Sequence, residues 1–131
     1  KKNKWGRINN MTAVSVKEPL SYLALSNTVR SSVISWAKTL SNDIGENNIT
    51  VNNILTGFFD TERLKELNFE KAIKMNLKID DLYDSMKEQV PLKRIGKPEE
   101  FGYLVSFLAS DYASYINGSN IPIDGGLLKS I

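Results

Sequence analysis

The pattern of hydrophobic and polar positions divides this 131-residue chain into alternating strands and helices. Short runs rich in apolar and β-branched residues predict three strands, at Arg7–Met11, Ile49–Leu55 and Asn120–Ile123. The segments between them are long and carry apolar residues at helical spacing. Because parallel strands need long crossover connections, this order predicts an α/β architecture with adjacent parallel strands.

Three helical regions fill the connections. The first runs from about Ser21 to Ile44, and Gly45 is expected to end it as a left-handed residue. Its apolar stripe consists of Val29, Val33, Trp36, Ala37, Leu40 and Ile44. Residues 60–90 predict two or three helical pieces. The last helix begins at Pro98, a residue favoured at the first helical position.

Composition narrows the possible functions. The chain has 17 basic and 15 acidic residues, a net charge of +2, which argues against a nucleic-acid or membrane partner. It has no cysteine and no histidine, which excludes disulfides, thiolate metal sites and a Ser-His-Asp triad. No apolar stretch approaches the roughly 20 residues that span a bilayer. Composition therefore gives no sign of a nucleic-acid or membrane partner.

Several motifs follow one another in the last third of the chain. They are Pro91-Leu-Lys-Arg-Ile-Gly-Lys-Pro-Glu-Glu100, Phe107-Leu-Ala-Ser-Asp111, Gly118 and Asp124-Gly-Gly126. Together they resemble the C-terminal part of the short-chain dehydrogenase/reductase family, Rossmann-fold oxidoreductases that use NAD or NADP. The resemblance implies that residues 1–131 are the C-terminal half of a doubly wound fold, a partial Rossmann-like parallel sheet with flanking helices. The family's glycine-rich phosphate loop has no counterpart in these residues, and the role expected for the segments Arg94–Glu100 and Asp124–Gly126 is structural.

The family's catalytic residues map onto the start of the first helix. The resemblance places the family's tyrosine on Tyr22, the lysine four positions later on Ser26, and the serine pair at the strand end on Thr12-Ala13. Tyr22 and Thr12 are thus the candidate catalytic residues, and Ser26 is a candidate cofactor contact. A spacing of four would put Tyr22 and Ser26 on one helical face. Arg30 does not replace the lysine, because it lies roughly 12 Å along the helix axis from Tyr22.

A second segment resembles the family's nicotinamide-binding run. In Val51-Asn-Asn-Ile-Leu-Thr-Gly-Phe-Phe-Asp-Thr61, Gly57 and Thr61 match the family pattern, whereas Thr56 replaces its proline. The resemblance implies that the backbone N–H of Phe59 donates to the carboxamide of the cofactor. Gly57, Phe59 and Thr61 are therefore the cofactor-binding candidates. The structural alternative is an ordinary strand-to-helix turn, in which glycine and threonine are common.

The resemblance implies a cytoplasmic oxidoreductase that transfers hydride between NAD or NADP and a carbonyl or alcohol substrate. The alternative is a non-catalytic homologue or fragment that acts as a binding or assembly module. An unpaired edge at Arg7–Met11 implies a homo-oligomer, or association with the N-terminal half of the family's fold. Tyr22 and Gly57 are expected at the carboxyl-end rim of the strands, where open α/β sheets bind ligands.

Overall fold

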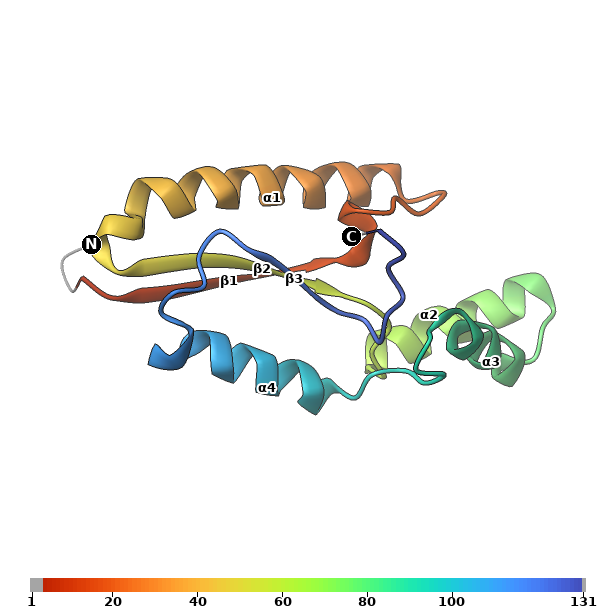
Figure 1. Cartoon of the computed structure of the whole chain (residues 1–131). Coiled ribbons are helices and arrows are strands. Elements are labelled where there is room, and N and C mark those ends of the chain that lie inside the picture. Colours follow the sequence, from red (N-terminus) through yellow and green to blue (C-terminus); the bar gives the residue numbers. More distant parts are fainter. Residues whose placement is uncertain (1–3, 131) are drawn as a thin grey trace.

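The computed structural model describes residues 4–130 and contains a parallel sheet in the order β1–β2–β3 (Figure 1). The strands are β1 (Gly6–Ala13), β2 (Ile49–Thr56) and β3 (Asn120–Ile123). The register of the first pair runs from Gly6 opposite Ile49 to Ala13 opposite Thr56. The predicted adjacency, direction and α/β architecture of the three strands are confirmed.

Helices cover both faces of this sheet (Figure 1). They are α1 (Ala24–Ile44), α2 (Glu62–Met75), α3 (Ile79–Gln89) and α4 (Pro98–Ala109). Helix α1 lies on one face and α4 on the other, so β2 is enclosed between two layers. Helices α2 and α3 extend beyond the carboxyl ends of the strands, which confirms that residues 60–90 form separate helical pieces.

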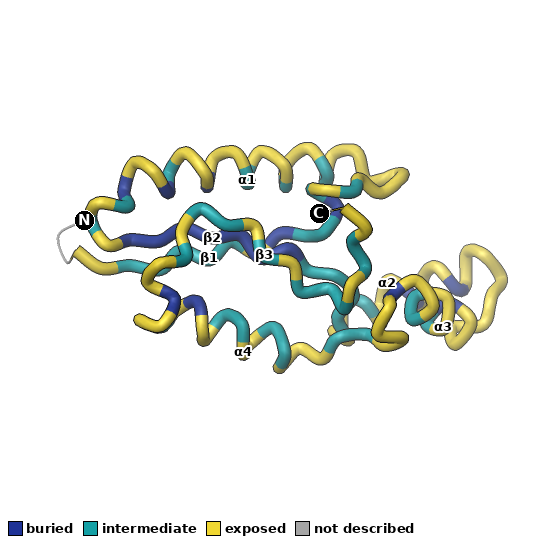
Figure 2. The backbone as a smooth tube through the Cα atoms, viewed as in Figure 1, coloured by how far each residue is buried: buried dark blue, intermediate teal, exposed yellow. Residues whose placement is uncertain are grey.

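The core forms two clusters, one on each face of β2. Figure 2 shows that β2 is buried along most of its length. On the α1 side, Ala37 and Ile44 pack against Ile49 and Val51. On the α4 side, Leu108 packs with Ile54 and Ala113. The seven residues from Ile49 to Leu55 are all buried, as expected for a strand with a helix on each face.

The predicted stripe of α1 is only partly buried. Val29 and Trp36 are 53% and 54% exposed, whereas Ala37 is fully buried. These two residues lie at one margin of the stripe, and the buried face is shifted toward the other margin, where Ser41 is 2% exposed. Within residues 4–130, Val29 and Trp36 therefore form an exposed apolar margin of the predicted stripe.

Both ends of α1 differ from the prediction. The helix begins at Ala24 rather than Ser21, because Tyr22 has a φ of 64° and cannot continue a right-handed helix. At the other end, Gly45 has a right-handed φ of −58° and starts a 3₁₀ turn, Gly45–Asn47. The left-handed residue is Asn48, with a φ of 56°. Asparagine tolerates this conformation better than most residues, so it ends the turn in place of glycine.

Three asparagines form a hydrogen-bonded ladder across the sheet. The Nδ2 of Asn10 donates to the Oδ1 of Asn53 at 3.0 Å, and the Nδ2 of Asn53 donates to the Oδ1 of Asn120 at 2.8 Å. Asn53 is 2% exposed, so this ladder satisfies a polar group inside the sheet. Asn10 lies two residues from Ile8, which packs into the α1 cluster, and therefore points to the same face.

Candidate active site

The carboxyl ends of the three strands meet at one rim. The hydroxyl of Thr56 donates to the carbonyl of Thr12 at 2.8 Å, and the N–H of Gly57 donates to the carbonyl of Ile123 at 3.0 Å. The loop before α1 reaches the same rim, because the carboxylate of Glu18 accepts from the backbone N–H groups of Lys129 and Ser130 at 2.9 and 2.7 Å. These two contacts lower the pKa of Glu18, with the larger effect from Ser130.

Gly57 is required by the close approach of β2 and β3. A Cβ atom at this position would lie 2.7 Å from the Cα of Asp124 and 2.8 Å from its Cβ. Neither atom can move without displacing the backbone that follows β3. Glycine therefore brings the two strand ends together, and the predicted break in the strand at this residue is confirmed.

The segment after Gly57 is held in place by two backbone hydrogen bonds with Gly96. The N–H of Asp60 donates to the carbonyl of Gly96, and the N–H of Gly96 donates to the carbonyl of Phe58, each at 2.9 Å. The N–H of Phe59, which lies between these two residues, meets no acceptor within residues 4–130. The side chain of Phe59 packs edge-on against Phe101, with ring centroids 6.2 Å apart.

Thr61 caps α2. Its extended backbone precedes the helix, and its hydroxyl oxygen accepts from the N–H of Leu64 at 3.3 Å. This is the position that the structural alternative, an ordinary strand-to-helix turn, gives Thr61. A hydroxyl oxygen that accepts this bond still has its own hydrogen to donate.

Gly57, Phe59 and Thr61 line one pocket of about 380 Å³. Arg30 from α1 and Met11 from the edge of β1 line the same pocket. Ser26 is connected to the pocket indirectly, because the Nε of Arg30 donates to its hydroxyl oxygen at 3.2 Å. The structure therefore gathers the cofactor-binding candidates at one place.

Sequence reasoning missed Arg30 as a pocket residue. The prediction set it aside because of its distance from Tyr22 along the helix. The relevant spacing is instead the one from Ser26, because residues four apart on a helix are neighbours. That spacing was visible in the sequence.

The two catalytic candidates do not join this pocket. Thr12 is 2% exposed, and its hydroxyl donates to the carbonyl of Ile54 at 3.1 Å. Tyr22 is fully exposed in the turn before α1. The Nδ2 of Asn27 holds this turn by donating to the carbonyl of Leu20 at 2.9 Å. Because Tyr22 lies outside the helix, the expected common helical face with Ser26 does not form.

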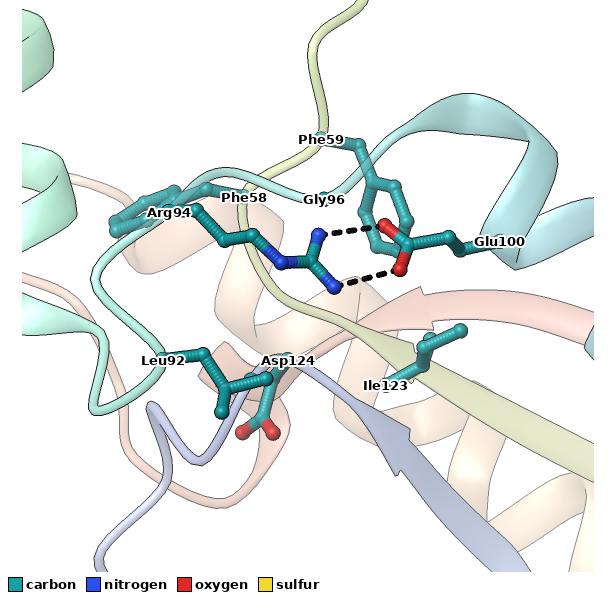
Figure 3. Close-up of a pocket in the computed structure, with 9 residues that line it drawn as sticks. Phe58, Phe59, Leu92, Arg94, Gly96, Glu100, Ile123 and Asp124 are labelled. Carbon is teal, nitrogen blue, oxygen red and sulfur yellow. Dashed lines mark hydrogen bonds and ion pairs between the residues drawn. The ribbon is translucent and has the colours of Figure 1, made fainter.

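A smaller cavity of about 170 Å³ lies beneath the start of α4 (Figure 3). Arg94 and Glu100 form a bidentate ion pair across it, with N–O distances of 2.7 and 2.6 Å. Glu100 also accepts from the backbone N–H of Lys97 at 2.7 Å. Arg94 and the Lys97 amide hold the pKa of Glu100 at about 2. Arg94 and Glu100 neutralise each other here, which is consistent with the structural role expected for this motif.

The ionised Glu100 predicts a specific acid sensitivity. Its pKa falls from 4.5 to about 2 on folding, so its contribution to the free energy of unfolding is complete above pH 4.5 and is lost as pH falls toward 2. We expect Glu100→Gln to lower stability most above pH 5 and least near pH 2. Urea denaturation between pH 2 and 7 measures this. Glu99→Gln is the matched control, and an equal loss in both variants would contradict the prediction.

Two kinds of site are not found within residues 4–130. No group of three or more acidic side chains is arranged to hold a metal ion. None of the helices described is both long and apolar enough to cross a membrane.

Comparison with known proteins gives concordant matches. A family model described as enoyl-(acyl carrier protein) reductase matches residues 1–128. The NADPH-dependent reductase BacG of Bacillus subtilis (strain 168) is 34% identical over 131 residues, which is all of this chain and 51% of that protein. The chain therefore spans about half the length of the curated relatives it matches.

Solved structures agree with these matches. YwfH, an NADPH-dependent reductase involved in bacilysin biosynthesis, has a TM-score of 0.91 and 35% identity over 99% of this chain and 50% of its own. L-sorbose reductase from Gluconobacter frateurii, complexed with NADPH and L-sorbose, has a TM-score of 0.91 and 28% identity over the same shares of the two chains. The architecture described above is thus that of half of each of these enzymes.

Proposed function

Because the chain belongs to the short-chain dehydrogenase/reductase family, we propose that the protein transfers hydride between NAD or NADP and a carbonyl or alcohol substrate. The observation that carries this proposal is the pocket at the rim of the sheet, where Gly57, Phe59 and Thr61 lie together. The NADPH named for BacG and for the sorbose reductase supports NADP as the cofactor.

The residues of the pocket fit the nicotinamide end of a dinucleotide. The N–H of Phe59 has no acceptor within the described chain and is available to donate to a carboxamide oxygen. Thr61 offers a hydroxyl hydrogen beside it, and Gly57 keeps the approach free of side-chain atoms. When bound, the cofactor supplies or accepts the hydride. These residues hold and orient its ring, while phosphate binding requires a glycine-rich loop that this sequence does not contain.

The proton that accompanies the hydride needs a donor. We assign this role to Tyr22. Thr12 and Ser26 stand where the resemblance places the family's serine pair and its lysine. Tyr22 lies in the turn between Glu18, which is tied to the segment after β3, and the start of α1. For Tyr22 to act, this turn must carry its hydroxyl from solvent toward the pocket. Such a movement separates no packed contact of the Tyr22 side chain, which is fully exposed, but it strains the hydrogen bond by which Asn27 holds the turn.

The open edge of β1 supports an association. Its Asn10 and Met11 lie where a further strand would pair, and a long unpaired edge invites another chain segment. We propose that the protein works as a homo-oligomer, or with an N-terminal half of the family's fold paired to β1. The same proposal assigns it to the cytoplasm.

The oxidation of NADPH by the full-length protein tests the function. With a panel of ketones and aldehydes, we expect steady loss of absorbance at the nicotinamide wavelength. Tyr22→Phe should lower kcat by about 100-fold, the lower range for removal of a general acid. Tyr115→Phe, another fully exposed tyrosine, is the control and should leave kcat unchanged. NADPH binding without turnover on any substrate would favour the non-catalytic module instead.

A further inference from the structure

Arg30 places a positive charge in the pocket described above. It projects from the first half of α1 into a space also lined by Gly57 and Thr61. Its Nε donates to the hydroxyl oxygen of Ser26 at 3.2 Å, which fixes the side chain by a bond to a neutral group. The remaining N–H groups of the guanidinium meet no acceptor within residues 4–130.

The charge of Arg30 lacks a neutralising partner. No carboxylate lies among the residues that line this pocket, and Arg30 forms no ion pair within the described chain. The second arginine of the pocket, Arg63, is paired with Glu66 at 3.2 Å on the surface. Arg94 in the smaller cavity is paired in two places with Glu100. A carboxylate in the pocket would give the half-buried guanidinium of Arg30 the charged partner that Arg63 and Arg94 already have.

The walls of the pocket are apolar. Phe58, Leu64, Leu67 and Phe101 line it together with Met11. Two of these residues come from α2 and one from α4, so both helices contribute to the apolar wall. Pockets of this kind bind ligands with a large apolar body, and the few polar groups fix the orientation.

From these observations we propose that the pocket takes an organic acid, with its apolar body against α2 and α4 and its carboxylate on Arg30. This inference rests on the proposed function and names its substrate class, a carbonyl compound that carries a carboxylate. The guanidinium presents several N–H donors in one plane, a geometry that matches a carboxylate. Inorganic anions and the diphosphate of the cofactor share the anionic chemistry but lack the apolar body that the walls favour.

A matched pair of ligands tests the proposal. Isothermal titration calorimetry on the full-length protein compares 3-phenylpropionate with its neutral counterpart 3-phenylpropanamide, with and without NADPH. We expect the acid to bind at least about 10-fold more tightly than the amide. Arg30→Gln should weaken binding of the acid by about 10- to 100-fold and leave the amide unchanged. Arg30→Lys should retain part of the affinity, and Arg94→Gln is the control that changes neither ligand.

The outcomes separate the possible anions. Equal affinity for acid and amide, or unchanged affinity for the acid in Arg30→Gln, would overturn the proposal. So would a loss of NADPH affinity in Arg30→Gln with the acid unaffected, because Arg30 would then bind the cofactor diphosphate. Failure of the wild-type protein to bind NADPH would instead remove the proposed function, while the acid and amide titrations would still report on Arg30. Thermal unfolding of each variant verifies that it is folded.

Discussion

Replacing Gly57 by alanine is expected to destabilise the protein by about 3 kcal/mol, the upper end for overpacking of a tight site. The new methyl group would lie 2.7 Å from the Cα of Asp124, so the end of β2 and the segment after β3 must separate. That movement displaces Phe59 and Thr61 from the pocket, and we expect the affinity for NADPH to fall with the stability. Urea denaturation and a fluorescence titration with NADPH measure the two effects.

Gly102 provides the matched control. It lies in α4, and an added Cβ atom would meet no other atom within 4 Å. The same exchange to alanine should stabilise the protein by about 0.5 to 1 kcal/mol, because glycine is unfavourable inside a helix. Opposite signs at the two positions are the expected result. Similar effects at Gly57 and Gly102 would show that the contact with Asp124 does not decide the residue at position 57.

Replacing Asn53 by leucine is expected to lower the free energy of unfolding by about 2 to 4 kcal/mol. The two side chains are similar in size, but leucine cannot bond to Asn10 or to Asn120. Two hydrogen bonds are lost, and the partner amides remain in a partly buried sheet. Denaturation in urea measures the loss, and it should appear in the midpoint with little change in the slope.

Two further variants isolate the ladder. Asn42→Leu makes the same exchange on the exposed face of α1 and should change stability by no more than about 0.5 kcal/mol. In the double variant Asn10→Leu with Asn53→Leu, both partners of one hydrogen bond become apolar, so part of the loss should be recovered. A double variant as unstable as the sum of its parts would mean that packing, rather than the ladder, explains the effect.

The fold was predictable where one physical pattern dominates. The β-branched run of β2 identified a strand, and Pro98 marked the first residue of α4. The ends of α1 were not predictable in this way, since they depend on which residue adopts a left-handed backbone. Tyr22 and Asn48 adopt it, and neither is a glycine, the residue that most clearly predicts a left-handed backbone from sequence.

The candidate site was predictable in part. Gly57, Phe59 and Thr61 are close in sequence, so a single turn gathers them, and a local motif identified them correctly as neighbours. Thr12 and Tyr22 belong to different elements, and their relation depends on the turn that Asn27 and Glu18 hold. Arg30 was missed because it was judged by its distance from Tyr22, whereas its spacing of four from Ser26 was the signal that placed it beside that residue.

The ladder of asparagines has a direction. The amide nitrogens of Asn10 and Asn53 both point toward β3. The edge of β1 therefore presents an oxygen, the Oδ1 of Asn10, that meets no donor within residues 4–130. A strand that docks beside β1 with an N–H or O–H side chain opposite Asn10 extends the chain of hydrogen bonds. An apolar side chain there leaves this oxygen without a donor, and an acidic side chain repels it. The edge therefore favours a docking strand that has a donor side chain opposite Asn10, a selectivity that backbone pairing alone does not provide.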